Sequence, residues 1–305
     1  MHTHPRFGGI WIPLVTPMTA DGAQIDLPAA QRLADFYISA GVAGLVVCGT
    51  TGEAATLSEN EQDRLLAAIL EVAQRRCGVM MGAAGNDTEA LARRIRQFDA
   101  DDLAALLIAP PPYVKPSQDG ILAHYTRLAA ATRHAIVLYN IPSRTGVNLE
   151  VATVTKLAAS GRFPALKESA GNIPHLINLI ESGTLDVLAG DDSLLLVTLL
   201  MGGTGAISAS AHIRPDLFVA LHRCVRDRRY AEAQLLARQL QPLTALLFTE
   251  PNPAPVKTML ALQGRISDRM RLPMVPVSTE TRAALAAELA RIEAIPAPSR
   301  IALAA

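Results

Sequence analysis

The feature of this sequence that most constrains its fold is a repeated alternation between short apolar runs and longer stretches of helical periodicity. The apolar runs have the length and composition of buried strands, and the stretches between them place apolar residues three or four positions apart. The clearest helix start is Ser58, followed three residues later by Glu61, which is the pattern of a capping box. The runs expected to form strands are residues 9–16, 44–49, 78–83, 105–109, 135–140, 164–167, 185–189 and 205–209.

About eight strand–helix repeats in a chain of 305 residues favour an α/β fold of the (β/α)8 or TIM-barrel type. The pattern alone does not distinguish this barrel from an open, doubly wound sheet. Three helical segments without strands follow the last strand, at residues 228–248, 253–264 and 278–293. We therefore predict a barrel over residues 1–225 and a C-terminal three-helix appendage, packed on the barrel, over residues 226–305.

Composition indicates a soluble protein with a large core, because half of the residues are hydrophobic and the formal net charge is zero. Arginines occur in small groups along the chain, which is typical of solvated helix faces and argues against a nucleic acid partner. The three cysteines are far apart and odd in number, as expected for reduced thiols in the cytoplasm. The longest apolar stretch, 194–201, is too short to span a membrane.

Lys167 is one of only four lysines among 28 basic residues, and it lies in the short apolar run 163–169. A charged amine in such a setting is costly unless it is paired or loses its proton. A neutral amine in a dry pocket can attack a carbonyl and form a Schiff base. The alternative is a lysine that extends from the strand end to the protein surface.

Two further strand ends carry complementary chemistry, because a barrel places its active site at the carboxyl ends of its strands. Residues 49–53 read Gly-Thr-Thr-Gly-Glu, and their hydroxyls and amides can face an anion. Tyr139 ends the fifth strand, and its phenol can shuttle protons during imine formation. Arg144 follows a short loop later and can hold a carboxylate through two hydrogen bonds. If these residues have no functional role, Tyr139 would be a phenol buried in the core and Arg144 would form a structural ion pair.

Other features of the sequence argue against a phosphate-binding site and against a metal site. The glycines at 202, 203 and 205 precede the last strand and so face the other end of the barrel, which argues against phosphate binding. The seven histidines lack metal-ligand spacing. Tyr113 follows three prolines, and the structural alternative for this residue is a brace for a stiff loop.

Five motifs together resemble the dihydrodipicolinate synthase family, which belongs to the pyruvate-dependent class I aldolases related to N-acetylneuraminate lyase. The likeness extends from residue 9 to about residue 282. The motifs are Gly-Thr-Thr-Gly-Glu at 49–53, Tyr-Asn-Ile-Pro-Ser-Arg-Thr-Gly at 139–146, Leu-Lys-Glu at 166–168, Gly-Asp-Asp at 190–192 and Glu-Pro-Asn-Pro-Ala-Pro-Val-Lys at 250–257.

The resemblance implies a role for each catalytic residue. Lys167 would condense with pyruvate, and Tyr139 would act as acid and base near the imine. Thr51 would connect Tyr139 to Tyr113 in a proton relay, with Tyr113 supplied by a neighbouring subunit. The family therefore suggests catalysis in a homotetramer made of two tight dimers.

The resemblance also implies the substrate contacts. Pyruvate would bind at Thr50, Thr51, Gly190 and the carbonyl of Ile207. Arg144 would hold the carboxylate of L-aspartate 4-semialdehyde. The product would be 4-hydroxy-tetrahydrodipicolinate on the route to lysine, and the reaction would need no metal or organic cofactor.

The sequence departs from the family pattern at the lysine inhibitor site. The matching positions read Pro112, Glu59, Gln62 and Ala90, and only Asn86 is retained. The pocket thus lacks its ammonium-binding acid and its stacking surface, and we expect no appreciable inhibition by lysine.

Two other functions remain as alternatives. The loop before Tyr113 carries Pro110 and Pro112 where the family has a threonine and an aromatic residue. The protein could therefore be another pyruvate-dependent class I aldolase or dehydratase that acts on a different aldehyde, a sugar acid or a keto acid. The second alternative is a catalytically silent barrel that binds a keto acid as a sensor or partner.

Overall fold

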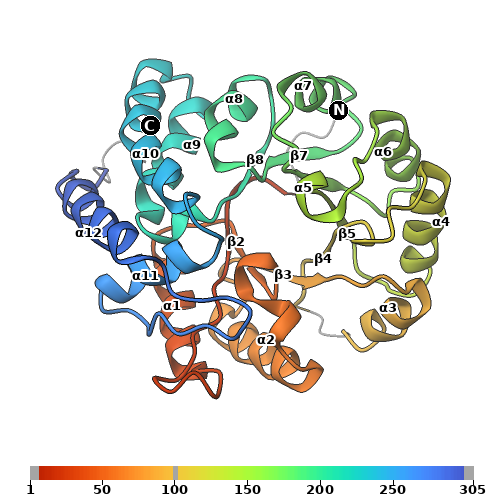
Figure 1. Ribbon diagram of the computed structural model, residues 1–305. Coiled ribbons are helices and arrows are strands. Elements are labelled where there is room, and N and C mark those ends of the chain that lie inside the picture. Colours follow the sequence, from red (N-terminus) through yellow and green to blue (C-terminus); the bar gives the residue numbers. More distant parts are fainter. Residues whose placement is uncertain (1–6, 99–101, 299–305) are drawn as a thin grey trace. The chain divides into compact units, whose positions relative to one another are not determined.

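The computed structural model describes residues 7–98 and 102–298, and its eight strands form a closed barrel in sequence order (labels as in Figure 1). The predicted TIM barrel is confirmed, and the open sheet is excluded because the strand order closes on itself. All eight predicted strands are present, with ends that differ from the prediction by at most three residues. The strands are β1 (Gly9–Pro13), β2 (Gly44–Val47), β3 (Gly78–Ala83), β4 (Ala105–Ile108), β5 (Ile136–Asn140), β6 (Ala165–Glu168), β7 (Asp186–Ala189) and β8 (Gly205–Ile207).

The chain divides into two compact units, and the first comprises residues 78–207 together with the described residues up to Gly9. Its neighbouring strands β3 to β8 pair in parallel, and every residue of β4, β5 and β6 is buried. Helices α3, α4, α6 and α7 cover the outer side of these strands in Figure 1. The helical elements are α3 (Thr88–Ile95), α4 (Gln118–Ala129), α5 (Pro142–Thr145), α6 (Val151–Ala158), α7 (Ile173–Glu181), η3 (Asp192–Leu194) and α8 (Leu195–Leu200).

Local sequence explains where several of these elements begin and why Gly205 is required. The side chains of Asp87, Ser117 and Asn172 accept hydrogen bonds from the first turns of α3, α4 and α7. A Cβ at residue 205 would overlap the backbone of Gly9, so only glycine fits there. Close backbone packing therefore accounts for this glycine without a bound phosphate.

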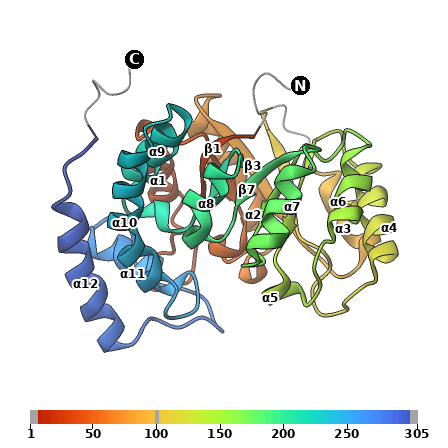
Figure 2. The ribbon, with the colours of Figure 1, turned by 90° about the horizontal axis from the view of Figure 1, so that it is seen from above.

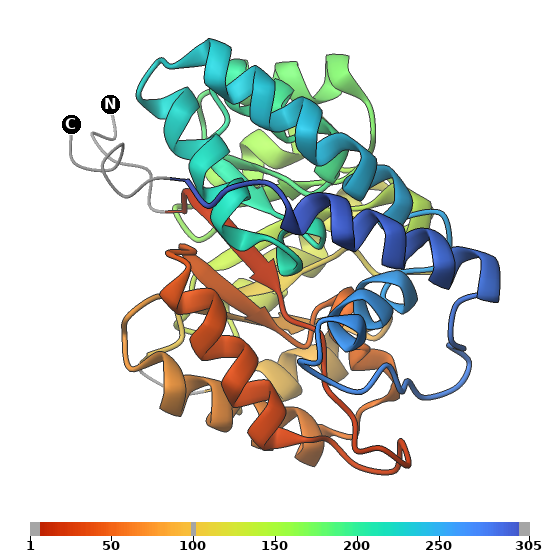
Figure 3. The same ribbon diagram turned by 90° about the vertical axis from the view of Figure 1, so that its left-hand side faces the viewer.

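The second unit comprises residues 10–77 and the chain from 208 onward. The predicted capping box of Ser58 and Glu61 is confirmed at the start of α2. Helices α10, α11 and α12 confirm the three predicted C-terminal helices, and they pack on one another (Figures 2 and 3). Among the described residues, no helix is both long and apolar enough to cross a membrane. The helical elements are α1 (Leu27–Ser39), η1 (Thr50–Gly52), η2 (Ala54–Thr56), α2 (Glu59–Ala73), η4 (Ser210–His212), α9 (Pro215–Arg226), α10 (Tyr230–Leu247), α11 (Ala254–Leu262) and α12 (Thr279–Glu293).

Candidate active site

Lys167 and Tyr139 lie opposite each other on the neighbouring strands β6 and β5. They are register partners in a parallel pair, so their side chains leave the sheet on the same face. Both residues are buried, with exposed fractions of 7% and 8%. The Lys167 Nζ atom is 4.3 Å from the centroid of the Tyr139 ring. A lysine that reaches the surface is therefore excluded, and the structure brings the predicted nucleophile and the predicted acid–base residue together.

Gly190 packs directly against the side chain of Lys167. A Cβ at this position would lie 2.1 Å from Ser169 Oγ, 2.7 Å from Lys167 Cγ and 2.8 Å from Lys167 Cε, which is closer than such atoms approach. The Gly190 N–H donates to the carbonyl of Glu168 at 2.7 Å and continues the pairing of β6 with β7 beyond the strand end. The predicted substrate-binding glycine thus adjoins the reactive lysine, and its missing side chain leaves room for the amine.

Arg144 lies on α5, the short helix that begins two residues after β5 ends. The carbonyl of Ile141 accepts hydrogen bonds from the N–H groups of Arg144 and Thr145, both at 3.0 Å, and fixes the start of this turn. The Arg144 side chain is exposed, and its guanidinium has no ion-pair partner within residues 7–98 and 102–298. The predicted carboxylate-binding arginine therefore points its charge into solvent, where a ligand can reach it.

Tyr113 is 88% exposed and has a left-handed backbone conformation with φ of 70°. A side chain with this exposure does not brace its own loop. It also does not join the buried pair of Lys167 and Tyr139 in the single chain. The structure therefore leaves Tyr113 outside the site, and a catalytic role for its phenol requires a second copy of the protein.

The threonine turn predicted to bind the pyruvate carboxylate lies in the second unit, on η1. Thr50 is exposed and Thr51 is buried, with 4% exposed. The Thr51 Oγ1 atom accepts a hydrogen bond of 2.9 Å from Asn252 Nδ2, so the hydroxyl proton of Thr51 is free to be donated elsewhere. Ile207, the remaining predicted contact, ends β8 and is fully buried.

A buried ion pair supports this turn, and sequence reasoning did not assign it a role. Lys257 Nζ donates to Glu53 Oε1 at 2.6 Å and to the carbonyl of Thr16 at 2.8 Å. Lys257 has no exposed surface, and Glu53 is 6% exposed. Burial lowers the pKa of the Lys257 ammonium, and the Glu53 carboxylate opposes this shift. Each charge therefore depends on the other for its stability in the core.

A sequence signal for Lys257 was present, because it is a rare lysine inside the apolar run that forms α11. Its partner Glu53 is 204 residues away in the sequence, and no local pattern links the two. Glu53 also adopts a left-handed conformation with φ of 56°, which is uncommon for a residue other than glycine. The pair thus holds a strained residue directly after the threonine turn.

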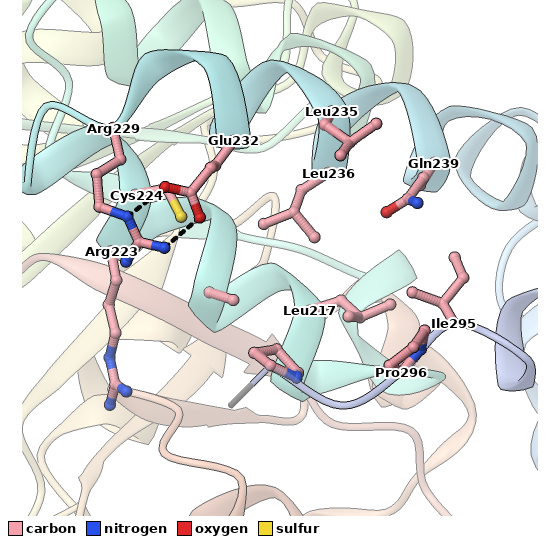
Figure 4. Close-up of a pocket in the computed structure, with 12 residues that line it drawn as sticks. Leu217, Arg223, Cys224, Arg229, Glu232, Leu235, Leu236, Gln239, Ile295 and Pro296 are labelled. Atoms are coloured by element: carbon pink, nitrogen blue, oxygen red, sulfur yellow. Dashed lines mark hydrogen bonds and ion pairs between the residues drawn. The ribbon is translucent and has the colours of Figure 1, made fainter. Parts of the chain in front are cut away.

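A cavity of about 280 Å³ lies in the second unit between α9, α10 and residues 295–298 (Figure 4). Leucine side chains of both helices line it, and the ion pair of Arg229 and Glu232 lies at one end. None of the predicted site residues lines this cavity. It is therefore no part of the site predicted from the sequence.

Comparison with known proteins gives a consistent result over almost the whole chain. The model of the Dihydrodipicolinate synthetase family matches residues 6–292. The 4-hydroxy-tetrahydrodipicolinate synthase of Acidobacterium capsulatum is 40% identical over 299 residues, covering 96% of this chain and 99% of that protein.

Solved structures agree with the sequence relatives. The chloride-inhibited dihydrodipicolinate synthase from Acinetobacter baumannii, in complex with pyruvate, has a TM-score of 0.91 at 32% identity and covers 94% of this chain and 99% of its own. The enzyme from Cyanidioschyzon merolae, with lysine bound, has a TM-score of 0.91 at 31% identity and covers 95% and 100%. On the strength of these matches and the buried lysine–tyrosine pair, the chain belongs to the dihydrodipicolinate synthetase family.

Proposed function

We propose that this protein is a Schiff-base lyase that condenses pyruvate with L-aspartate 4-semialdehyde to give 4-hydroxy-tetrahydrodipicolinate in lysine and diaminopimelate biosynthesis. The observation that carries the proposal is the buried pair of Lys167 and Tyr139, whose amine and ring centroid are 4.3 Å apart. Family membership and the pyruvate complex of the relative from Acinetobacter baumannii support it.

The chemistry begins at the amine of Lys167. The nitrogen attacks C2 of pyruvate, water leaves, and a protonated imine forms. Tyr139 transfers the protons, with Thr51 and the Tyr113 of a neighbouring subunit as the relay. The imine withdraws electrons, so the methyl carbon loses a proton and becomes an enamine that attacks the aldehyde carbon. The amine of the second substrate then attacks C2, closes the ring and releases Lys167.

Substrate binding divides between two sets of residues. Thr50, Thr51, Gly190 and the carbonyl of Ile207 hold pyruvate, and the exposed guanidinium of Arg144 holds the carboxylate of the aldehyde. The reaction takes place in a cytoplasmic homotetramer, a dimer of dimers, in which each site receives one Tyr113 from a partner. The 88% exposure of Tyr113 in the single chain supports this arrangement.

Lysine does not regulate the enzyme in this proposal, although the relative from Cyanidioschyzon merolae was solved with lysine bound. The Gln62 Nε2 atom already donates to the carbonyls of Ala54 and Leu57, so this side chain has a local structural role. Ala90 supplies no carboxylate for the ligand ammonium. A lysine titration to millimolar concentration should leave the rate within about twofold, and strong inhibition would contradict this part of the proposal.

Reduction with borohydride in the presence of pyruvate tests the Schiff base. We expect the mass of the protein to increase by one reduced pyruvate adduct, and we expect Lys167→Ala to abolish the increase. No adduct on the wild-type protein would rule out the lyase and favour a barrel that only binds a keto acid. A panel of aldehydes offered with pyruvate then identifies the second substrate. A clear preference for a sugar or keto acid would favour a different pyruvate-dependent aldolase.

A further inference from the structure

Asn140 and Glu168 form a second pair of register partners directly next to Tyr139 and Lys167. Side chains alternate between the two faces of a strand, so this pair leaves the sheet on the face opposite the reactive amine. Asn140 has no exposed surface and Glu168 is 5% exposed. Two polar side chains this deeply buried require hydrogen-bond partners, and the partners of Asn140 include Asn148, on the segment that carries Arg144.

The Asn140 amide uses both of its N–H donors, and its oxygen accepts one hydrogen bond. Its Nδ2 atom donates to Glu168 Oε2 at 2.9 Å, with Oε1 at 3.2 Å, and to Asn148 Oδ1 at 2.7 Å. Its Oδ1 atom accepts from the Leu149 N–H at 2.9 Å. A flipped amide would place NH₂ against the Leu149 N–H and oxygen against the Glu168 carboxylate. The partners therefore fix the orientation of the amide.

Glu168, Asn140, the Leu149 backbone and the half-buried His175 form a ring of polar groups, in which the contact of His175 with Glu168 is longer than a hydrogen bond. The Ala170 N–H donates to Glu168 Oε1 at 2.7 Å, and His175 Nε2 lies 3.8 Å from Glu168 Oε2. The backbone of Leu149 hydrogen-bonds the His175 ring. Burial raises the pKa of Glu168 to about 7, against the hydrogen bonds from Asn140 and Ala170, and burial lowers the pKa of His175. The ring thus connects the end of β6 to the start of α7 and to the chain at Leu149.

The segment 141–148 begins and ends on this ring, with Arg144 in its middle. Asn140 is the last residue of β5, and its own side chain holds Asn148 and Leu149 where the segment returns. The Asn140 amide therefore holds the returning end of the segment together with Gln118, whose Nε2 atom donates to the Asn148 carbonyl at 2.8 Å. The Asn140 amide is itself held by the Glu168 carboxylate.

We infer that Asn140 and Glu168 are positioning residues that hold Arg144 at the place where the carboxylate of the second substrate binds. The inference deepens the proposed function and rests on it. Neither residue touches a substrate, because their side chains lie on the face of the sheet opposite Lys167. Their effect is therefore on recognition of the aldehyde and not on imine formation.

Asn140→Asp tests the inference with little change in side-chain volume. The aspartate keeps an acceptor for Leu149 but places a second carboxylate against Glu168 in place of a donor. We expect the KM for the aldehyde to rise roughly tenfold at pH 8, while borohydride trapping of pyruvate stays within about twofold of wild type. At pH 6 the carboxylates of the aspartate at position 140 and of Glu168 can share one proton, which restores a hydrogen-bond donor between them. The ratio of the aldehyde KM of Asn140→Asp to that of wild type should therefore be smaller at pH 6 than at pH 8.

Glu168→Gln is the milder companion variant, because it keeps an acceptor for Asn140 and loses the charge. We expect an aldehyde KM about threefold above wild type and the same normal trapping of pyruvate. If Asn140→Asp fails to fold, this variant provides the same separation of the two readouts. Equal losses of pyruvate trapping and aldehyde recognition in the folded variants would overturn the inference.

A double-mutant cycle with Arg144→Ala identifies the route of the effect. If Asn140 acts through Arg144, Asn140→Asp should change the aldehyde KM by less than about twofold in the Arg144→Ala background. If Asn140→Asp instead raises the aldehyde KM by the same factor with and without Arg144, the inference is overturned. An aldehyde KM unchanged by Arg144→Ala would overturn it together with the proposed role of Arg144, and absence of a pyruvate adduct on wild type would instead overturn the proposed function as a whole.

Discussion

A single absent side chain, at Gly190, gives the most direct test of the Lys167 site. A Cβ there would lie 2.1 Å from Ser169 Oγ as well as 2.7 Å and 2.8 Å from Lys167 Cγ and Cε, so Gly190→Ala must shift the side chains of both Ser169 and Lys167. We expect trapping of pyruvate to fall at least tenfold, about 1.4 kcal/mol or more, while the circular dichroism spectrum stays unchanged. The matched control is Gly85→Ala, because a Cβ at residue 85 would meet only Leu91 Cβ at an ordinary 3.7 Å. Equal trapping in the two variants would contradict the assigned packing.

The raised pKa of Glu168 makes a prediction about stability and pH. A carboxyl whose pKa increases from 4.5 in the unfolded chain to about 7 in the fold contributes stability that is complete below about pH 4.5. This contribution is lost as the pH rises towards 7. Glutamine cannot titrate, so the stability of wild type relative to Glu168→Gln should decrease between pH 5 and pH 8. Urea unfolding at the two pH values measures the difference, and a constant or growing advantage of wild type would contradict the prediction.

At the scale of elements, helix α11 supports the threonine turn through the pair of Lys257 and Glu53. Lys257→Met leaves the Glu53 carboxylate buried without its partner, which typically costs about 3 to 5 kcal/mol. We expect a loss of this size in urea unfolding, together with a higher KM for pyruvate. The double variant Lys257→Met with Glu53→Gln should regain most of the stability, because no unpaired charge remains. Equal stability of the single and double variants would show that the charge of Glu53 is not the cause.

Elements and strand-end residues were predictable for local reasons. The eight strands follow from apolar runs, and the start of α2 follows from Ser58 and Glu61, because these signals lie within a few residues of one another. The contacts that position the site were not predictable in this way. Lys257 meets Glu53 across 204 residues, and Asn140 meets Glu168 only because β5 and β6 are neighbours in register. Such pairings exist only after the barrel has formed.

At the scale of the whole molecule, we predict that catalysis requires at least two subunits, because each active site uses the Tyr113 of a partner. Lys167→Ala and Tyr113→Phe should each reduce activity strongly when studied alone. Mixed dimers should regain up to about one quarter of wild-type activity, because random pairing makes half of the dimers mixed and each of these has one intact site. A mixture of Lys167→Ala and Tyr139→Phe is the control, and it should show no recovery, because both residues come from the same chain. Recovery in neither mixture would contradict the supply of Tyr113 by a partner subunit.

The segment from Asn140 to Leu149 has one further consequence, for the divergence of such enzymes. Its returning end is held by the buried amide of Asn140, where it begins, and Lys167 lies on the separate strand β6. Exchange of these few residues, in evolution or in the laboratory, can therefore change the aldehyde that the enzyme accepts. The residues that form the carbon–carbon bond, Lys167 and Tyr139, would stay the same.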